Sequence, residues 1–274
     1  TSRMNTPLGP IGYALAFTAG LVAVFAAGLL WARAGVVSED GFTENVVQAA
    51  EDEAVQQEIA NVTVRQMIEA EPLLRLSRPI LQRAAEAAVS TRAFREGIFE
   101  DAVRNLHRTA FDESRQRLVL DLTALVDLIV AEVDRIENQF DVIDLQLDSN
   151  AGEVAIEDIG ALRSGARFAN RVDVLAPWMP MLAAALLAAG VLIARWHVAL
   201  VVFAGGVVAT AVLSWLALVL ARSGLSSRLD DDTSRGSADA LWQAFLPPLP
   251  LALIALSLVA VVVAAAGVVG HSLV

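Results

Sequence analysis

Four long apolar runs divide the chain, at residues 11–32, 175–194, 198–221 and 249–270. Each run is long enough to cross a bilayer as a helix, because a hydrocarbon core about 30 Å thick takes roughly 20 residues at about 1.5 Å each. A charged insert of 140 residues separates the first run from the second. The pattern therefore predicts a multi-pass membrane protein that carries one folded, water-facing domain.

The runs divide the chain into three expected parts. These are an N-terminal tail with transmembrane helix 1 (1–33), a water-facing domain (34–173), and transmembrane helices 2–4 (174–274) with an outer loop at 222–247. Ala32, Arg33 and Ala34 have the form of a signal-peptide cleavage site, but the first run is longer than the usual h-region of about 7–15 residues. We therefore expect a retained anchor.

Helical spacing of apolar residues dominates the insert. It predicts helices over 43–71, 79–89, 91–111 and 123–140, and another that runs from 159 toward the second apolar run. Thr43 is the expected N-cap of the first helix, and Asp52 is an expected break within it. Residues 118–122 look extended, and a turn-forming sequence at 148–152 lies between two short apolar stretches. We therefore expect a mainly α membrane protein whose helical domain includes a small β-hairpin or mini-sheet.

Charge is concentrated in the insert, which has 27 acidic residues and 14 arginines, a net charge of −13. The N-terminal tail has Arg3 and no acidic residue, and the turn from Arg195 to His197 also has none. Because short cytoplasmic segments retain an excess of positive residues, both segments are expected in the cytoplasm. The N- and C-termini would then be cytoplasmic, and residues 34–173 would form an extracytoplasmic domain of a cell-membrane protein.

Composition narrows the classes of function and source. The chain has no lysine among its 20 basic residues and is rich in alanine, valine and leucine, which is typical of a high-GC prokaryote. It has no cysteine, so neither disulfides nor a catalytic thiol are available. The acidic insert argues against nucleic acid as a partner, and against direct docking of this domain on anionic lipid.

Several short segments resemble a group of uncharacterised actinobacterial integral membrane proteins. They are residues 31–42 (WARAGVVSEDGF), 52–60 (DEAVQQEIA), 94–107, 118–122 (LVLDL) and 175–180 (LAPWMP). The resemblance covers the whole chain through loose apolar patterns. It implies four spans with a helical extracytoplasmic domain between spans 1 and 2, and it implies no particular reaction.

No motif in the sequence indicates a catalytic, cofactor or metal site, and we expect a protein that is not an enzyme. His107 has no second histidine near it in the sequence to share a metal, so we expect it to pack or form hydrogen bonds rather than to act as a ligand. Residues 230–232 are three consecutive aspartates without the glycine and terminal glutamate of an EF-hand, which favours a solvated acidic turn.

The apolar runs contain no Asp, Glu, Lys, Arg or His between their ends, which argues against an ion-coupled transporter. They contain instead small residues at a spacing of four, which lets transmembrane helices approach closely. Gly20, Gly205 and Gly206 are the expected packing positions. The lipid bilayer is the first expected partner, and self-association is one alternative.

Residues 238–246 form an amphipathic segment before the last run, with Leu241, Trp242 and Phe245 on one side. We expect this segment to lie in the outer membrane–water interface, directly before the fourth span. The alternative is that it forms a lateral docking surface for another membrane protein.

Two classes of function fit these observations. The first is a non-enzymatic membrane scaffold or accessory subunit whose acidic domain binds another envelope or membrane protein. The alternative is a permease-like subunit of the FtsX and MacB type, coupled to a cytoplasmic ATPase, although the expected cytoplasmic segments are very short for such a partner. A lipid- or envelope-related role of unspecified kind is also open.

Overall fold

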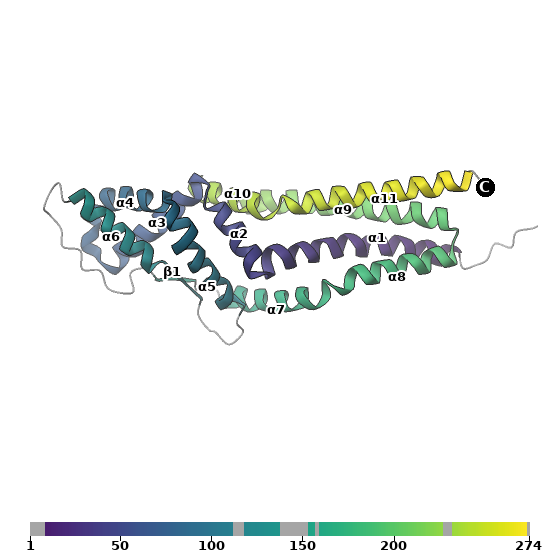
Figure 1. The fold of residues 1–274 in the computed structure, drawn as a ribbon, viewed down its shortest axis with the longest axis horizontal. Helices are drawn as coiled ribbons and strands as arrows, with labels where there is room; N and C mark the ends of the chain where they lie inside the picture. Colours follow the sequence, from purple (N-terminus) through teal and green to yellow (C-terminus); the bar gives the residue numbers. More distant parts are fainter. Residues whose placement is uncertain (1–8, 112–117, 138–152, 157–158, 227–231, 273–274) are drawn as a thin grey trace, which may run out of the picture. The chain divides into compact units, whose positions relative to one another are not determined.

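The computed structural model describes residues 9–111, 118–137, 153–156, 159–226 and 232–272, and these are mainly α-helical. The chain divides into two compact units (Figure 1). We call Thr1–Val37, Asn170–Arg228 and Leu246–Val274 the membrane unit, and Ser38–Ala169 with Leu229–Phe245 the helical unit. The fold is thus of the mainly α class that the periodicity predicts.

Three helices of the membrane unit are long and apolar enough to cross a bilayer. The helices of this unit are α1 (Gly9–Ala32), α8 (Trp178–Ile193), α9 (Trp196–Ser226) and α11 (Pro248–Ser272). The stretches that satisfy the requirement are Gly9–Val37, Trp196–Gly224 and Pro248–Val269. Length and composition therefore agree with a multi-pass membrane protein.

The second apolar run is interrupted by a bend. Helix α7 (Ile159–Leu175) and α8 meet at an angle of 45°, and α8 has only 16 residues. Pro177 lies at the break, where its ring removes a backbone N–H and disfavours the helical conformation of the residue before it. The membrane unit has a fourth candidate span only if this bent pair counts as one.

Glycines set the distance between α1 and its neighbours. A Cβ atom on Gly20 would lie 2.6 Å from the carbonyl oxygen of Phe203, and one on Gly206 would lie 2.7 Å from that of Phe17. Two of the three predicted packing positions therefore lie where α1 crosses α9 with their backbones in contact. Gly205 has open space around its Cβ position and faces away from this crossing.

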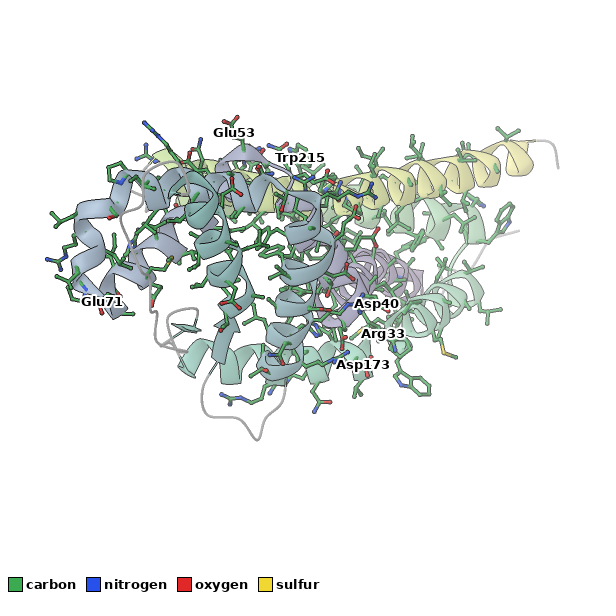
Figure 2. The ribbon with its side chains drawn as sticks, turned by 60° about the vertical axis from the view of Figure 1, so that its left-hand side comes forward. Arg33, Asp40, Glu53, Glu71, Asp173 and Trp215 are labelled. Atoms are coloured by element: carbon green, nitrogen blue, oxygen red, sulfur yellow. The ribbon has the colours of Figure 1, made fainter. Side chains whose placement is uncertain are left out.

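An ion pair lies close to the α7–α8 break. Arg33 donates from Nε to Oδ1 of Asp173 at 2.8 Å (Figure 2). Beside it, Leu29 and Ala32 of α1 pack against buried side chains at the end of α7. Both charged side chains are about half exposed, so the apolar cluster contributes more to this junction than the ion pair does.

The helical unit encloses a core of its own. Its helices are α2 (Glu39–Ala49), α3 (Glu53–Ala70), α4 (Arg78–Ser90), α5 (Glu100–Ala110), α6 (Thr123–Glu137) and α10 (Asp232–Phe245), with a 3-10 turn at Pro72–Ser77 and a π-helical segment at Phe94–Phe99. Fully buried side chains include Phe94, Met67, Leu81, Leu125 and Ile129. They face one another from α3, α4, α6 and the π-helical segment, so one apolar cluster joins these elements.

Strands β1 (Leu118–Asp121) and β2 (Glu153–Ile156) form a two-stranded antiparallel sheet in which Leu118 pairs with Ile156. Residues 142–152, which hold the other arm and the turn of the expected hairpin, lie outside the described residues.

Helix starts in the helical unit are set by side-chain caps. Ser38, and not Thr43, caps α2, since its hydroxyl accepts from the backbone N–H of Gly41 at 3.4 Å. The prediction for Thr43 was wrong because this residue lies inside α2 with its side chain buried. Asp52 interrupts the predicted helix as expected, because its carboxylate accepts from the N–H of Ala54 at 2.9 Å and starts α3.

Helix α10 is part of the helical unit, although the sequence suggested an outer loop and an interfacial lead-in for this segment. The Ser237 hydroxyl donates to the carbonyl oxygen of Ala54 on α3 at 2.9 Å. A Cβ on Gly236 would lie 2.7 Å from the Cβ of Ala54, and Ala240 is buried in the core of the helical unit. Two segments of the chain, far apart in sequence, thus build this unit together.

Candidate functional site

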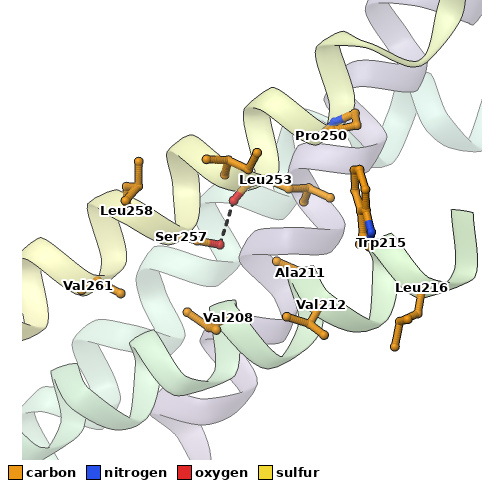
Figure 3. A pocket seen from close by; sticks show the side chains of 11 residues that line it. Val208, Ala211, Val212, Trp215, Leu216, Pro250, Leu253, Ser257, Leu258 and Val261 are labelled. Atoms are coloured by element: carbon orange, nitrogen blue, oxygen red, sulfur yellow. Dashed lines mark hydrogen bonds between the residues drawn. The ribbon is translucent and has the colours of Figure 1, made fainter. Parts of the chain in front are cut away.

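An apolar groove lies between α9 and α11 in the described part of the membrane unit. It has a volume of about 460 Å³ (Figure 3). It is lined by Val208, Ala211, Val212, Trp215, Leu216, Pro250, Leu253, Ile254, Ser257, Leu258 and Val261. Its volume lies within the range of about 300–1,000 Å³ that is usual for small-ligand pockets.

The walls of the groove follow the helical rows of α9 and α11. Val208, Val212 and Leu216 recur every four residues along α9 and form one wall. Ile254 and Leu258 form a matching row on α11. Rows at this spacing are the ridges between which a third helix can pack its own side chains.

The floor of the groove is formed by small residues. Ala211 and Ser257 have the smallest side chains in the lining, and both are only partly exposed. Trp215 and Pro250 lie at one end of the groove (Figure 3). The short side chains of the floor, between taller ones on either side, account for the empty space.

Two hydroxyl groups near the groove form hydrogen bonds within their own helices. Ser257 donates to the carbonyl oxygen of Leu253 at 2.8 Å, as Figure 3 shows, and Thr210 donates to that of Gly206 at 2.8 Å. Such internal bonds remove the cost of an unpaired polar group in hydrocarbon. The groove therefore offers apolar contact, and the side chains in its lining include no group for acid–base chemistry.

An ionic cluster joins α2 to α5 in the helical unit. Arg108 binds Glu39 through two hydrogen bonds, at 2.7 and 2.9 Å. Arg104 binds Asp40 at 2.9 Å and Glu100 at 3.0 Å. The hydrogen bond from Arg108 lowers the pKa of the Glu39 carboxyl below its ordinary value, and its carboxylate raises the pKa of Arg108 in return.

Aromatic side chains lie beneath this cluster. His107 is buried, with its ring 5.1 Å from that of Phe42 and 4.3 Å from that of Phe111. Phe42 also lies 5.7 Å from Phe245 of α10. The histidine therefore packs among phenyl rings where α2, α5 and α10 meet. These ring contacts hold the three helices together.

We expect Glu39→Gln to destabilise the helical unit most strongly above pH 4.5. Since the folded-state pKa of Glu39 is lowered, its stabilising contribution is present above the ordinary value of 4.5 and is lost as the pH falls through the lowered one. Thermal unfolding followed by circular dichroism at several pH values measures this. The Tm difference from the wild type should shrink on acidification, and a difference that stays constant with pH would contradict the assignment.

Glu69→Gln provides a matched control for this measurement. Glu69 is exposed on α3 and forms no ion pair within the described part of the chain. We expect its replacement to change the Tm little, because it removes a charge without removing a partner.

The three residues predicted as interface contacts on α10 have different environments. Phe245 packs on Phe42 within the helical unit, and Trp242 is partly buried. Leu241 is the most exposed of the three, at 39%. Much of the apolar face of α10 is therefore used within the protein.

Among the described residues, no three His, Cys, Asp or Glu side chains are placed so that they could hold a metal ion. Of the three consecutive aspartates, Asp232 begins α10, and residues 230 and 231 lie outside the described residues.

Sequence reasoning missed the groove. The spacing of Val208, Val212 and Leu216 was readable, but almost every position in α9 and α11 is apolar, so no face stands out. No family model matches this chain, and no curated protein or solved structure proved similar to it.

Proposed function

We propose that this protein is a non-enzymatic membrane scaffold or accessory subunit that binds a transmembrane helix of another protein. The observation that carries the proposal is the groove between α9 and α11. Its two walls are rows of side chains four residues apart, which is the arrangement into which the ridge of a third helix packs. A partner helix would fill the space with two or three of its own apolar side chains.

Packing is the interaction that this site can supply. Between transmembrane helices there is little hydrophobic driving force, because lipid tails are as apolar as leucine side chains. Association then depends on how well the surfaces fit. A groove of about 460 Å³ with a floor of small residues gives a partner helix more contact than a smooth helical surface would.

The helical unit is the water-facing part of the protein, and it would bind the same partner outside the membrane. Placing the short arginine-bearing segments at Arg3 and Arg195 in the cytoplasm puts the helical unit outside the cell. Its acidic surface would then meet the extracytoplasmic part of the same partner, and complementary charge there would set the orientation of the complex.

Filling the groove tests the proposal. Ala211→Phe and Ser257→Leu place bulk on the floor from α9 and α11 respectively. We expect each to reduce, by about tenfold or more, the amount of partner that copurifies from native membranes in mild detergent, because a clash at a packed helix interface costs about 1–3 kcal/mol. Quantitative mass spectrometry of the purified complex measures the loss.

Val262→Phe is the matched control, since Val262 is 66% exposed on α11 and lies outside the groove. It should retain the partner, and all variants should keep the wild-type Tm within a few degrees. A photoreactive residue at position 212 should crosslink to a membrane protein. Crosslinks to lipid alone would refute the proposal, and recovery of a cytoplasmic ATPase with every variant would favour a permease-like subunit instead.

A further inference from the structure

The turn that connects α3 to α4 exposes large apolar side chains to water. Leu73 is 78% exposed and Leu76 is 90% exposed, whereas Leu74 between them is buried in the core. Figure 2 labels Glu71 directly before this turn and Glu53 at the other end of α3. We call residues 72–83 the Leu–Arg tip of the helical unit.

The backbone of the tip explains this exposure. Glu71 has an extended conformation and Pro72 follows it, which ends α3 and starts a 3-10 turn. Side chains three residues apart lie above one another in such a turn. Leu73 and Leu76 therefore project from the same side, away from the core that holds Leu74.

The charge of the tip is opposite to that of the unit that carries it. The tip has Arg75, Arg78 and Arg83 and no acidic residue, within an insert of net charge −13. All three arginine side chains are exposed, and none of their guanidinium groups forms a hydrogen bond or ion pair within the described residues. By contrast, Arg104 and Arg108 are each held by carboxylates. The guanidinium groups of the tip are thus available to an external anion.

We propose that the Leu–Arg tip docks on the anionic surface of a bilayer separate from the one that its spans occupy. Leucine side chains on a convex turn can enter the boundary between headgroups and acyl chains, while neighbouring arginines pair with phosphate groups. A protein partner would need a concave apolar pocket with an acidic rim to match the same surface. A lipid bilayer supplies both an apolar interior and anionic headgroups, and it needs no preformed pocket.

Helix α10 leads directly into α11, and it binds the end of α3 that lies away from the tip. The 18 residues of α3 span about 27 Å, and the Leu–Arg tip lies at the end opposite to Ala54, where α10 is bound. Within the helical unit, the tip is therefore distant from the α10 contact. The acidic remainder of the unit is repelled by anionic lipid, but salt screens this repulsion beyond about 8 Å, so contact through the tip alone is favoured.

Vesicle binding by the full-length protein tests the proposal. The protein in phosphatidylcholine nanodiscs is mixed with sucrose-loaded vesicles of phosphatidylcholine, either pure or with an equal amount of phosphatidylglycerol, and the fraction that sediments is measured. We expect binding to the anionic vesicles only. Leu73→Ser with Leu76→Ser should reduce it more than about tenfold, and Arg75→Gln with Arg78→Gln about fivefold for each arginine.

Two controls establish whether the tip itself binds the vesicles. Leu241→Ser removes an exposed leucine elsewhere in the helical unit and should bind like the wild type. Binding should also persist when the nanodisc itself contains phosphatidylglycerol, whereas its loss would show that the tip binds its own membrane and would overturn the proposal. Equal binding of tip variants and wild type, or no preference for anionic vesicles, would overturn it as well.

Discussion

Replacing Gly20 with leucine is expected to force α1 away from α9 and to destabilise the membrane unit by about 3 kcal/mol or more. A Cβ at this position would lie 2.6 Å from the Phe203 carbonyl oxygen and 2.8 Å from the Val207 nitrogen. Both are backbone atoms, so neither can turn aside as a flexible side chain would. The helices must then separate, and the contact between Gly206 and Phe17 on the same crossing is lost with them.

Gly205→Leu is the control, because the Cβ position of Gly205 has no atom within 4 Å. Both substitutions replace a glycine with leucine, but only Gly20 lies at the crossing of α1 and α9. Thermal unfolding of the purified protein in detergent should show a lower Tm for Gly20→Leu alone. Equal losses would mean that the α1–α9 contact does not depend on close backbone approach.

Phe94→Ala should destabilise the helical unit by about 3–5 kcal/mol. The Phe94 side chain is fully buried, and its ring lies 5.5 Å from that of Phe99 in the core that joins the helices of this unit. Truncation removes its apolar contacts and leaves a cavity that a close-packed helical core can fill only partly. Denaturant unfolding followed by circular dichroism gives the free energy of unfolding.

Leu76→Ala is the comparison for this experiment, because Leu76 is 90% exposed. We expect it to change the free energy of unfolding by less than about 0.5 kcal/mol, as surface substitutions usually do. A large loss for Leu76→Ala would mean that the tip contributes to folding. A loss of vesicle binding by the tip variants would then reflect unfolding rather than the loss of lipid contacts.

The elements could be predicted from the sequence because their signals are local. Each of the four apolar runs coincides with a helix of the membrane unit, and apolar spacing predicted the helices on both sides of Asp52. Pro177 is also a local signal, for a bend before α8. It was missed because apolar residues lie on both sides of it. The cap of α2 was missed because serine and threonine are both preferred N-cap residues, so residue type alone did not decide between Ser38 and Thr43.

Contacts between distant segments could not be predicted in the same way. The apolar face of α10 is compatible with a membrane interface or with a protein core, and only the contact between Ser237 and Ala54 distinguishes them. Gly205 and Gly206 have the same residue type and nearly the same position, yet the rotation of α9 decides which one meets α1. Likewise, the sequence does not distinguish Leu74 in the core from its exposed neighbours in the tip.

The docking of α10 on α3 has a consequence for biosynthesis. Ser237 and its partner Ala54 are 183 residues apart, so a ribosome that adds about 5–20 residues per second needs roughly 10–40 s to deliver the second after the first. Until then, the surface of α3 around Ala54 stays uncovered and open to chaperones and proteases. If α9 were inserted in the wrong direction, α10 would emerge on the opposite side of the membrane from α3. The helical unit can therefore be completed only when α10 lies on the same side of the membrane as α3.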